Sequence, residues 1–485
     1  MAGSIDKISI RKQLDDLKVS FEQQVQSNTV DKDTVFLFNN LFALIEIILA
    51  VFMERQTKKN SRNSSIPPSQ TEPDESSSLD GQNSSSSKKR KLNKGSFSHQ
   101  KSRVSQRTIE VNFCSSCGEG LSNQPADTVE RRTKIDIIFQ TVTTHIDAET
   151  KTCPSCSEIN KGRFPADYQG PLQYGKGLKA YLINLIVVQM VALNRVQQMA
   201  FALVDRMISE AVILKYIMQL HMALERWENE SIALIRQQKV IHTDETSFKV
   251  NQKKHWIHVY SAGDTVLKFL HPKRGKDAIK DIDIIPNYFG VIIHDCWASY
   301  LSYEHCLHGL CGSHLLRELV FIIESNQYRW ASNMKRLLKQ TCKMVSKREN
   351  KQLIEKEYQK LQKHYRNILT RGEKEMPPIP EKPEGKRGKI AKSDAHNLLE
   401  RLRRHESAVL LFAKMPEVPF TNNRAERDLR MSKVKQKISG CFRTEQYAKA
   451  YCRISSYIQT MTAKGYNPMA AIEMAMSGEI YNANV

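Results

Sequence analysis

The spacing of apolar residues predicts helices at the start of the chain. Apolar positions recur at helical intervals from residue 5 to about residue 55, and residues 35–53 are almost continuously apolar. That stretch approaches the length of a membrane span. It contains Asn39, Asn40 and Glu46, however, and an acid at mid-membrane depth is costly. We therefore predict that residues 1–56 form a helical region that packs against another helix, in this chain or a partner, with no membrane involved.

The stretch from residue 57 to residue 108 lacks the apolar positions that a packed core needs. Ser, Asn, Gln, Lys and Pro dominate it, so we predict a disordered linker. Within it, residues 88–103 hold seven Lys and Arg and no acid. Such a basic arm can hold DNA through the phosphates, and a merely soluble linker explains the same composition equally well.

Helical spacing returns in residues 166–236, which follow a segment (109–165) with two Cys-x-x-Cys pairs. Ser209 is placed to cap the second of two amphipathic runs. Two such helices joined by a short turn occur in helix-turn-helix DNA-binding proteins, although core packing of an ordinary helical domain produces the same pattern more often. We predict a helical domain here and leave DNA binding by it open.

The pattern becomes strand-like at about residue 239. Three short β-rich runs with turns between them predict a meander, and a buried fourth strand, through Val291, Ile292 and Ile293, follows a short helix. Helical patterns resume after it. We predict an α/β fold with a mixed sheet flanked by helices. Its first part is 237–325, a helical insertion is 326–412, the last part is 413–470, and 471–485 is a tail.

The charge of the chain indicates the kind of partner that it binds. Lys and Arg number 73 against 52 Asp and Glu, a net charge of +21. An excess of this size indicates a polyanion, most often nucleic acid. Six of the ten cysteines stand alone, which does not suit a secreted disulfide scaffold, and we expect a cytoplasmic protein associated with the nucleoid.

Three acids stand where this order of elements would gather them. Asp244 lies on the first predicted strand, Asp295 directly follows the apolar run of the fourth, and Glu426 lies near the start of a late helix. If the fourth strand pairs in parallel with the first, Asp244 and Asp295 lie on neighbouring strands, and a helix on the sheet can add Glu426. Three carboxylates suit two Mg²⁺ (or Mn²⁺) ions that assist in-line displacement at phosphorus. Helix stabilisation is the alternative role for Glu426.

The helix that carries Glu426 is unusually basic. Residues 421–450 contain eight Lys and Arg against three Asp and Glu, and Asn422 or Asn423 is placed to cap the helix. We predict that these cations bind DNA phosphates, with His314 and Asn423 as supporting residues of the acidic site. The predicted DNA-binding residues are Arg424, Arg427, Arg430, Lys433, Lys435, Lys437 and Arg443.

The two Cys-x-x-Cys pairs predict a structural zinc site. Four thiolates in two such pairs make a closed tetrahedral site, whereas either pair alone could be a redox dithiol. The ligands would be Cys114, Cys117, Cys153 and Cys156. A second cluster offers Cys306, His308, Cys311 and His314; we favour core packing of its cysteines over a second zinc site, which stays open.

Several of these segments resemble the insertion sequence 66 family of DDE transposases. The longest match is NNRAERDLRMSKVKQKISGCFRTEQYAKAYCRISSYIQT. Before it in the chain, KKNSRNSSIPPSQ, HTDETSF, GVIIHDCWASY and CGSHLLREL follow the family's motifs in order. Two departures are an unusually apolar N-terminal region and Leu315 and Leu316 where many members are basic. Neither touches the three acids.

The resemblance implies an RNase H-like core in which Asp244, Asp295 and Glu426 are the DDE triad. It also implies a zinc-ribbon-like segment, and double-stranded DNA (element ends and target) as the substrate. We therefore expect Mg²⁺-dependent DNA cleavage and strand transfer by a homo-oligomer, with accessory proteins left open. The alternatives are a related metal nuclease without strand transfer, or a non-catalytic DNA-binding protein descended from a transposase.

Overall fold

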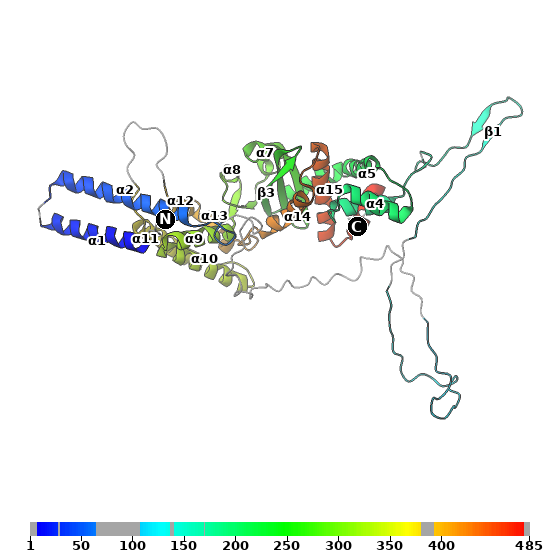
Figure 1. The fold of residues 1–485 in the computed structure, drawn as a ribbon, viewed down its shortest axis with the longest axis horizontal. Helices are drawn as coiled ribbons and strands as arrows, with labels where there is room; N and C mark the ends of the chain where they lie inside the picture. Colours follow the sequence, from blue (N-terminus) through cyan, green and yellow to red (C-terminus); the bar gives the residue numbers. More distant parts are fainter. Residues whose placement is uncertain are drawn as a thin grey trace, which may run out of the picture.

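The computed structural model describes residues 7–27, 30–64, 107–135, 140–168, 170–379 and 392–479. Most of the predicted linker, including its basic arm, lies outside these residues. The chain begins with a helical hairpin that extends from one end of the body, as Figure 1 shows. A two-stranded ribbon lies in an arm at the opposite end (Figure 1). These elements are α1 (Lys7–Gln26), α2 (Lys32–Gln56), β1 (Thr150–Thr152) and β2 (Ile159–Lys161).

A five-stranded mixed sheet forms the centre, with strand order β5–β4–β3–β6–β7. β3, β4 and β5 are an antiparallel meander, and β6 pairs in parallel with both β3 and β7. The predicted parallel pairing of the fourth strand beside the first is confirmed, with Val240 opposite Val291. The strands are β3 (Val240–Val250), β4 (Lys253–Ala262), β5 (Thr265–His271), β6 (Val291–His294) and β7 (Leu307–Leu310).

The fifth strand, β7, was not predicted. Its four residues include Gly309 and an exposed Leu307, so the run is too short and too mixed to show the alternation that marks a strand. Parallel pairing with β6 supplies the missing stabilisation. Gly309 is also hemmed in, because a Cβ there would lie 3.2 Å from a methyl group of Val418.

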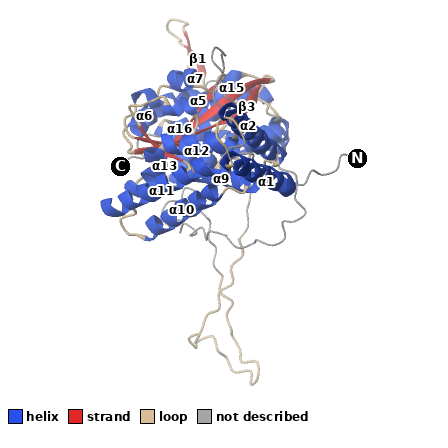
Figure 2. Cartoon of the chain, turned by 90° about the vertical axis from the view of Figure 1, so that its left-hand side faces the viewer, coloured by secondary structure: helices blue, strands red, loops and turns tan. Residues whose placement is uncertain are grey.

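Helices cover both faces of the sheet, as the two views show (Figures 1 and 2). β6 alternates between the two hydrophobic cores: Ile292 packs in one, and Val291 and Ile293 pack in the other. The first core contains helices that precede the sheet in the chain and helices that follow it. Those that precede it are α3 (Lys176–Val187), α4 (Leu193–Val204), α5 (Glu210–Ala223) and α6 (Glu225–Arg236). Those that follow it are α14 (Asn423–Ser439), α15 (Glu445–Ala463) and α16 (Pro468–Ser477).

The second core joins the other face of the sheet to the predicted insertion. Its helices are α9 (Gly312–Asn326), α10 (Arg329–Lys347), α11 (Glu355–Glu375), α12 (Asp394–Arg404) and α13 (Glu406–Lys414). Three short helices connect the strands: α7 (Lys276–Ile282), η2 (Ile285–Asn287) and α8 (Ala298–Leu301). The last part of the predicted insertion is two helices, α12 and α13, which meet at His405.

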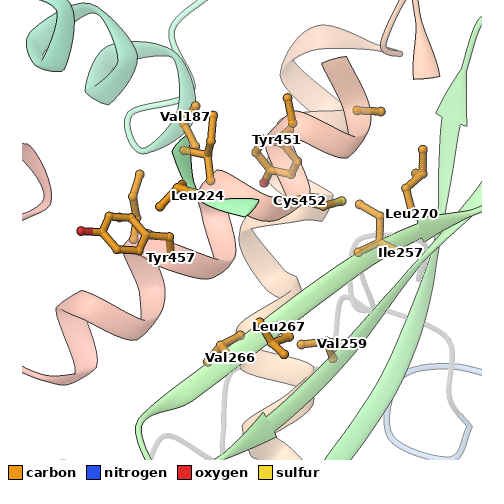
Figure 3. Packing of buried hydrophobic residues seen from close by; sticks show 14 of the residues in the cluster. Val187, Leu224, Ile257, Val259, Val266, Leu267, Leu270, Tyr451, Cys452 and Tyr457 are labelled. Carbon is orange, nitrogen blue, oxygen red and sulfur yellow. The ribbon is translucent and has the colours of Figure 1, made fainter. Parts of the chain in front are cut away.

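The first core holds α15 against β5. Leu267 and Leu270 of β5 and Cys452 of α15 are all buried, and Figure 3 shows them within this core. Two buried hydroxyls reinforce the contact, since Ser456 and Thr460 of α15 accept hydrogen bonds from the β5 backbone at 2.8 and 3.0 Å. Because α14 precedes α15 and packs on β3 and β4, this core fixes the helix that carries Glu426.

The N-terminal hairpin docks on the second core through polar side chains. The buried Glu54 accepts hydrogen bonds from the first amides of α12, Asp394 N at 2.7 Å and Ala395 N at 3.1 Å. Asn63 is also buried and donates to Glu324 of α9 at 2.6 Å. The predicted linker started at residue 57, but residues 57–64 are packed here, because the buried Asn63 finds hydrogen-bond partners that composition does not reveal.

Candidate active site and metal ligands

Two neighbouring strands place the first two acids. Asp244 lies on β3, and its Oδ1 accepts the amide of Glu245 at 2.9 Å. Asp295 follows β6, and its Oδ1 accepts the amide of Trp297 at 3.3 Å. Burial raises the pKa of Asp244 well above its usual value, and the charges of Glu245, Asp295 and, less, Glu426 raise it further. These acids therefore share one electrostatic environment.

Asn422 holds the start of α14 against β3. Its side chain is 1% exposed, donates from Nδ2 to the carbonyl of Thr243 at 2.8 Å, and accepts from His242 Nδ1 at 2.9 Å. Burial lowers the pKa of His242 to about 4, so the ring is neutral and Nδ1 carries its proton. Asn422 occupies the N-cap position as predicted, yet its side chain makes no cap hydrogen bond. It serves instead to position Glu426 beside the sheet.

A glycine brings α9 to the same place. Gly312 is the first residue of α9, its amide donates to the carbonyl of Phe420 at 2.8 Å, and the Phe420 ring occupies the space that a Cβ would fill. The start of α9 therefore lies against the chain that leads into α14. As a result Cys311 and His314, on either side of this contact, face Glu426.

Glu426 lies beside His314 and Arg317. Its Oε1 is 3.7 Å from His314 Nδ1 and 3.8 Å from Arg317 Nη2. Both Oε1 and Nδ1 are buried without a hydrogen-bond partner. Among the described residues, Cys311, His314 and Glu426 form the one group of three metal-binding side chains whose ligand atoms all lie within 4.8 Å of one another. Asp244, Asp295 and Glu426 do not form so compact a group.

A buried ion-pair network lies beside Asp244, and the sequence analysis did not predict it. Glu245 accepts from Arg274 Nε and from the Tyr300 hydroxyl, both at 2.7 Å. The Arg274 guanidinium also stacks on Trp297 at 3.7 Å and on Trp256 at 4.9 Å. Burial and the charge of Asp295 raise the pKa of Glu245 to about 7. The adjacent acids Asp244 and Glu245 were the only sequence signal for it.

The sequence of this part of the chain matches a known family. The model of the IS66 family of transposases matches residues 171–450, which is more than half of the chain. The chain belongs to the IS66 transposase family. No curated protein matches it in sequence. The matched region includes the sheet, the insertion and α14, and membership of a transposase family implies DNA as the substrate.

The predicted DNA-binding side chains of this family member differ in their exposure. Arg427, Arg430, Lys437 and Arg443 are exposed, whereas Lys435 is 7% exposed. Lys435 is therefore a poor phosphate ligand, because its position on α14 turns it toward the protein. Two further cations are half-buried and make local contacts: Arg424 donates to the Gly263 carbonyl, and Lys433 to the Ser247 carbonyl at 3.3 Å. Asn423 is exposed at the first residue of α14.

The two Cys-x-x-Cys pairs form similar tight turns. The Gly118 amide donates to the Cys114 carbonyl at 3.0 Å, and the Ser157 amide to the Cys153 carbonyl at 2.9 Å. Amides of each turn also lower the pKa of its first thiol, Cys114 or Cys153. Each turn thus resembles half of a zinc site. The structure does not bring the halves together among its described residues, so the zinc site remains a prediction.

The second cysteine and histidine cluster is divided by the fold. Cys306 is buried and donates to the Tyr288 carbonyl, and His308 contacts His294 at 3.0 Å. Cys311 and His314 lie instead at the start of α9, beside Glu426. The four residues do not form one group of ligand atoms in the described part of the chain. Only the half that meets Glu426 has the geometry of a metal site.

Proposed function

We propose that this IS66-family member is a DDE transposase, which cleaves DNA and transfers the cut strand with Asp244, Asp295 and Glu426 as metal ligands. The observation that carries the proposal is the pairing of β3 with β6 under the start of α14. It puts three acids that are distant in sequence into one environment, in which Asp295 and Glu426 both raise the pKa of Asp244. The order of the strands also supports an RNase H-like core.

The acids fit a divalent cation such as Mg²⁺ or Mn²⁺. A buried carboxylate with like-charged neighbours is unfavourable unless a cation neutralises it, and Glu426 Oε1 has no hydrogen-bond partner. Two ions bound there would activate the attacking oxygen and stabilise the leaving oxygen. Asn422 holds Glu426 near the sheet, and the exposed Arg427, Arg430 and Lys437 are available for phosphates along α14.

Two displacements at phosphorus follow in sequence. In the first, water bonds to a phosphorus at the element end, and the bond to the 3′ oxygen breaks, which leaves a 3′-hydroxyl. In the second, that hydroxyl bonds to a phosphorus of the target and displaces a 3′ oxygen there. The carboxylates remain unchanged. Joined products distinguish a transposase from a nuclease that has the same triad and stops after the first step.

The substitution Glu426→Gln tests the proposal. It removes a metal ligand and no phosphate contact, so cleavage should fall by about 10³-fold or more while DNA affinity stays nearly unchanged. Both are measured on one labelled element-end duplex with and without Mg²⁺. The matched control is Glu445→Gln, an exposed acid at the start of α15, which should cleave normally. Normal cleavage by Glu426→Gln would remove this residue from the active site.

A further inference from the structure

We propose that Cys311, His314 and Glu426 form a second metal site, which takes a thiophilic divalent cation such as Zn²⁺. The site offers one sulphur, one imidazole nitrogen and one carboxylate oxygen within 4.8 Å of one another. This is a ligand set that Zn²⁺ accepts and Mg²⁺ does not. The site is distinct from the two Cys-x-x-Cys turns and shares only Glu426 with the triad.

The distance between the ligand atoms suits a small ion. His314 Nδ1 and Glu426 Oε1 are 3.7 Å apart, which is too far for a hydrogen bond. Two ligands on a tetrahedral Zn²⁺ ion, each about 2.0 Å from the metal, lie about 3.3 Å apart. A shift of a few tenths of an ångström would therefore allow one ion to satisfy both buried atoms, which otherwise have no partner.

Backbone amides surround the sulphur of Cys311, but burial raises the pKa of its thiol, so the proton has to leave as a metal binds. Its Sγ accepts the amide of Asn422 at 3.2 Å, and it lies at the N-cap of α9, where helix amides favour an anion. His314 stands one turn later. Its Nδ1 is buried without a hydrogen-bond partner, and the lone pair of a neutral imidazole there can bind a metal. The Arg317 guanidinium lies 3.8 Å from Glu426 Oε1 and neutralises that carboxylate when no ion is bound.

The site has a regulatory consequence, which rests on the proposed function. An ion on Cys311 and His314 would hold Glu426 beside α9 and keep it from joining Asp244 and Asp295. Zn²⁺ should then inhibit cleavage that Mg²⁺ supports. Because Glu426 is shared, the two kinds of ion would compete for one side chain, and removing the sulphur should relieve the inhibition.

Cobalt binding tests the site without reference to activity. The protein is the full chain with Cys114, Cys117, Cys153 and Cys156 replaced by Ser, which removes the other thiolate pairs. We expect titration with Co²⁺ to produce a near-ultraviolet thiolate-to-cobalt band with visible bands of tetrahedral cobalt. Adding Cys311→Ser should abolish the near-ultraviolet band, and His314→Gln should weaken Co²⁺ binding by about tenfold or more.

Two further variants sharpen the cobalt test. Cys342→Ser removes a half-buried thiol of α10 outside the site, so it should leave the bands unchanged. Arg317→Gln removes the competing cation and should tighten Co²⁺ binding. Circular dichroism confirms that each variant is folded. The absence of a thiolate band, or a band that survives both Cys311→Ser and His314→Gln, would overturn the site.

Zinc inhibition tests the consequence. Each protein's cleavage rate with Mg²⁺ and Zn²⁺ is divided by its own rate with Mg²⁺ alone. We expect a loss of tenfold or more for the parent chain with the four serines and a ratio near one for its Cys311→Ser derivative. Equal inhibition of both would overturn the competition for Glu426. If the unaltered chain does not cleave DNA, the proposed function fails instead, and the cobalt bands still decide the metal site.

Discussion

The negative charge of Asp244 is unfavourable in the metal-free active site. Its pKa is raised by burial and by neighbouring acids, so without a cation its ionised form destabilises the fold. A carboxylate of this kind contributes stability below its unfolded pKa of about 3.9, and that contribution is lost as the pH rises through the elevated folded value. Metal-free protein should therefore lose stability on going from acidic to neutral pH at this site.

We predict that Asp244→Asn raises the melting temperature of metal-free protein at pH 7, because the amide mimics the protonated acid. The shift should be about 1–2 °C for each kcal/mol removed in a chain of this size, and it should vanish below about pH 4. Cleavage should be lost. Scanning calorimetry in the presence of a chelator measures the effect. Asp277→Asn is the control, because Lys273 lowers the pKa of that exposed acid, and this change should give no increase. A lower melting temperature for Asp244→Asn would contradict the argument.

Asn422 shows how one buried amide can position a catalytic helix. Asn422→Ala should destabilise the protein by about 2–4 kcal/mol, because the Thr243 carbonyl and His242 Nδ1 would be left buried without partners. Asn423→Ala, at the neighbouring exposed position, should change stability by less than about 0.5 kcal/mol. Urea denaturation of the two variants measures both. Similar costs for the two would show that Asn422 is not the residue that fixes α14.

At the scale of elements, α14 separates its tasks by face. Its inward face carries Leu429 and Lys435, its edge carries Glu426, and its exposed face carries Arg427, Arg430 and Lys437. A helix can do this because residues three or four apart share a face. Metal binding and DNA binding should therefore respond to different substitutions on the same helix.

We predict that Arg427→Ala weakens DNA binding about equally for all sequences and makes the salt dependence of binding shallower by about one unit. Lys435→Ala should leave the salt dependence unchanged, because its side chain is buried. Fluorescence anisotropy with one duplex across a salt series compares them. If Lys435→Ala made the salt dependence of binding shallower and Arg427→Ala left it unchanged, DNA would approach another face of α14.

At the scale of the whole molecule, the N-terminal hairpin leaves a stripe of apolar side chains uncovered. α2 is long and apolar enough to cross a membrane by length and composition. Its C-terminal end, however, is tied into the protein by the buried Glu54. The exposed residues recur at intervals of three and four, as in the seam of a coiled coil, and are Leu37, Leu41, Leu44 and Ile48. We propose that a second copy of the chain covers this stripe.

Replacing Leu37, Leu44 and Ile48 together by Gln should lower the oligomeric state without unfolding the core, because these side chains are exposed and belong to neither hydrophobic core. Sedimentation velocity measures the assembly. The matched control is Gln at Leu14 alone, a buried position that should disturb the hairpin itself. An unchanged sedimentation coefficient would exclude α2 as the interface, and complete partitioning of the unaltered protein into vesicles would favour a membrane span.

The sequence by itself determined the order and type of the main elements, because each is set by local spacing. The meander, the buried fourth strand and the helical insertion all follow from periods of two and 3.6 residues. It also marked Asp244, which lies on the first strand, and Asp295, which directly follows the fourth, without knowledge of the rest of the fold. The short β7 and the break at His405 were not predicted, because neither has a strong local pattern of apolar and polar residues.

Only the tertiary structure decided which distant residues share one environment. No local signal pairs Glu54 with the start of α12, sets Arg274 between Trp256 and Trp297, or turns Lys435 inward. The same holds for Glu426, whose neighbours are Cys311 and His314 because Phe420 packs on Gly312. Such contacts depend on how helices pack on the sheet, and packing is determined by the combined shape of many side chains rather than by the sequence around any one of them.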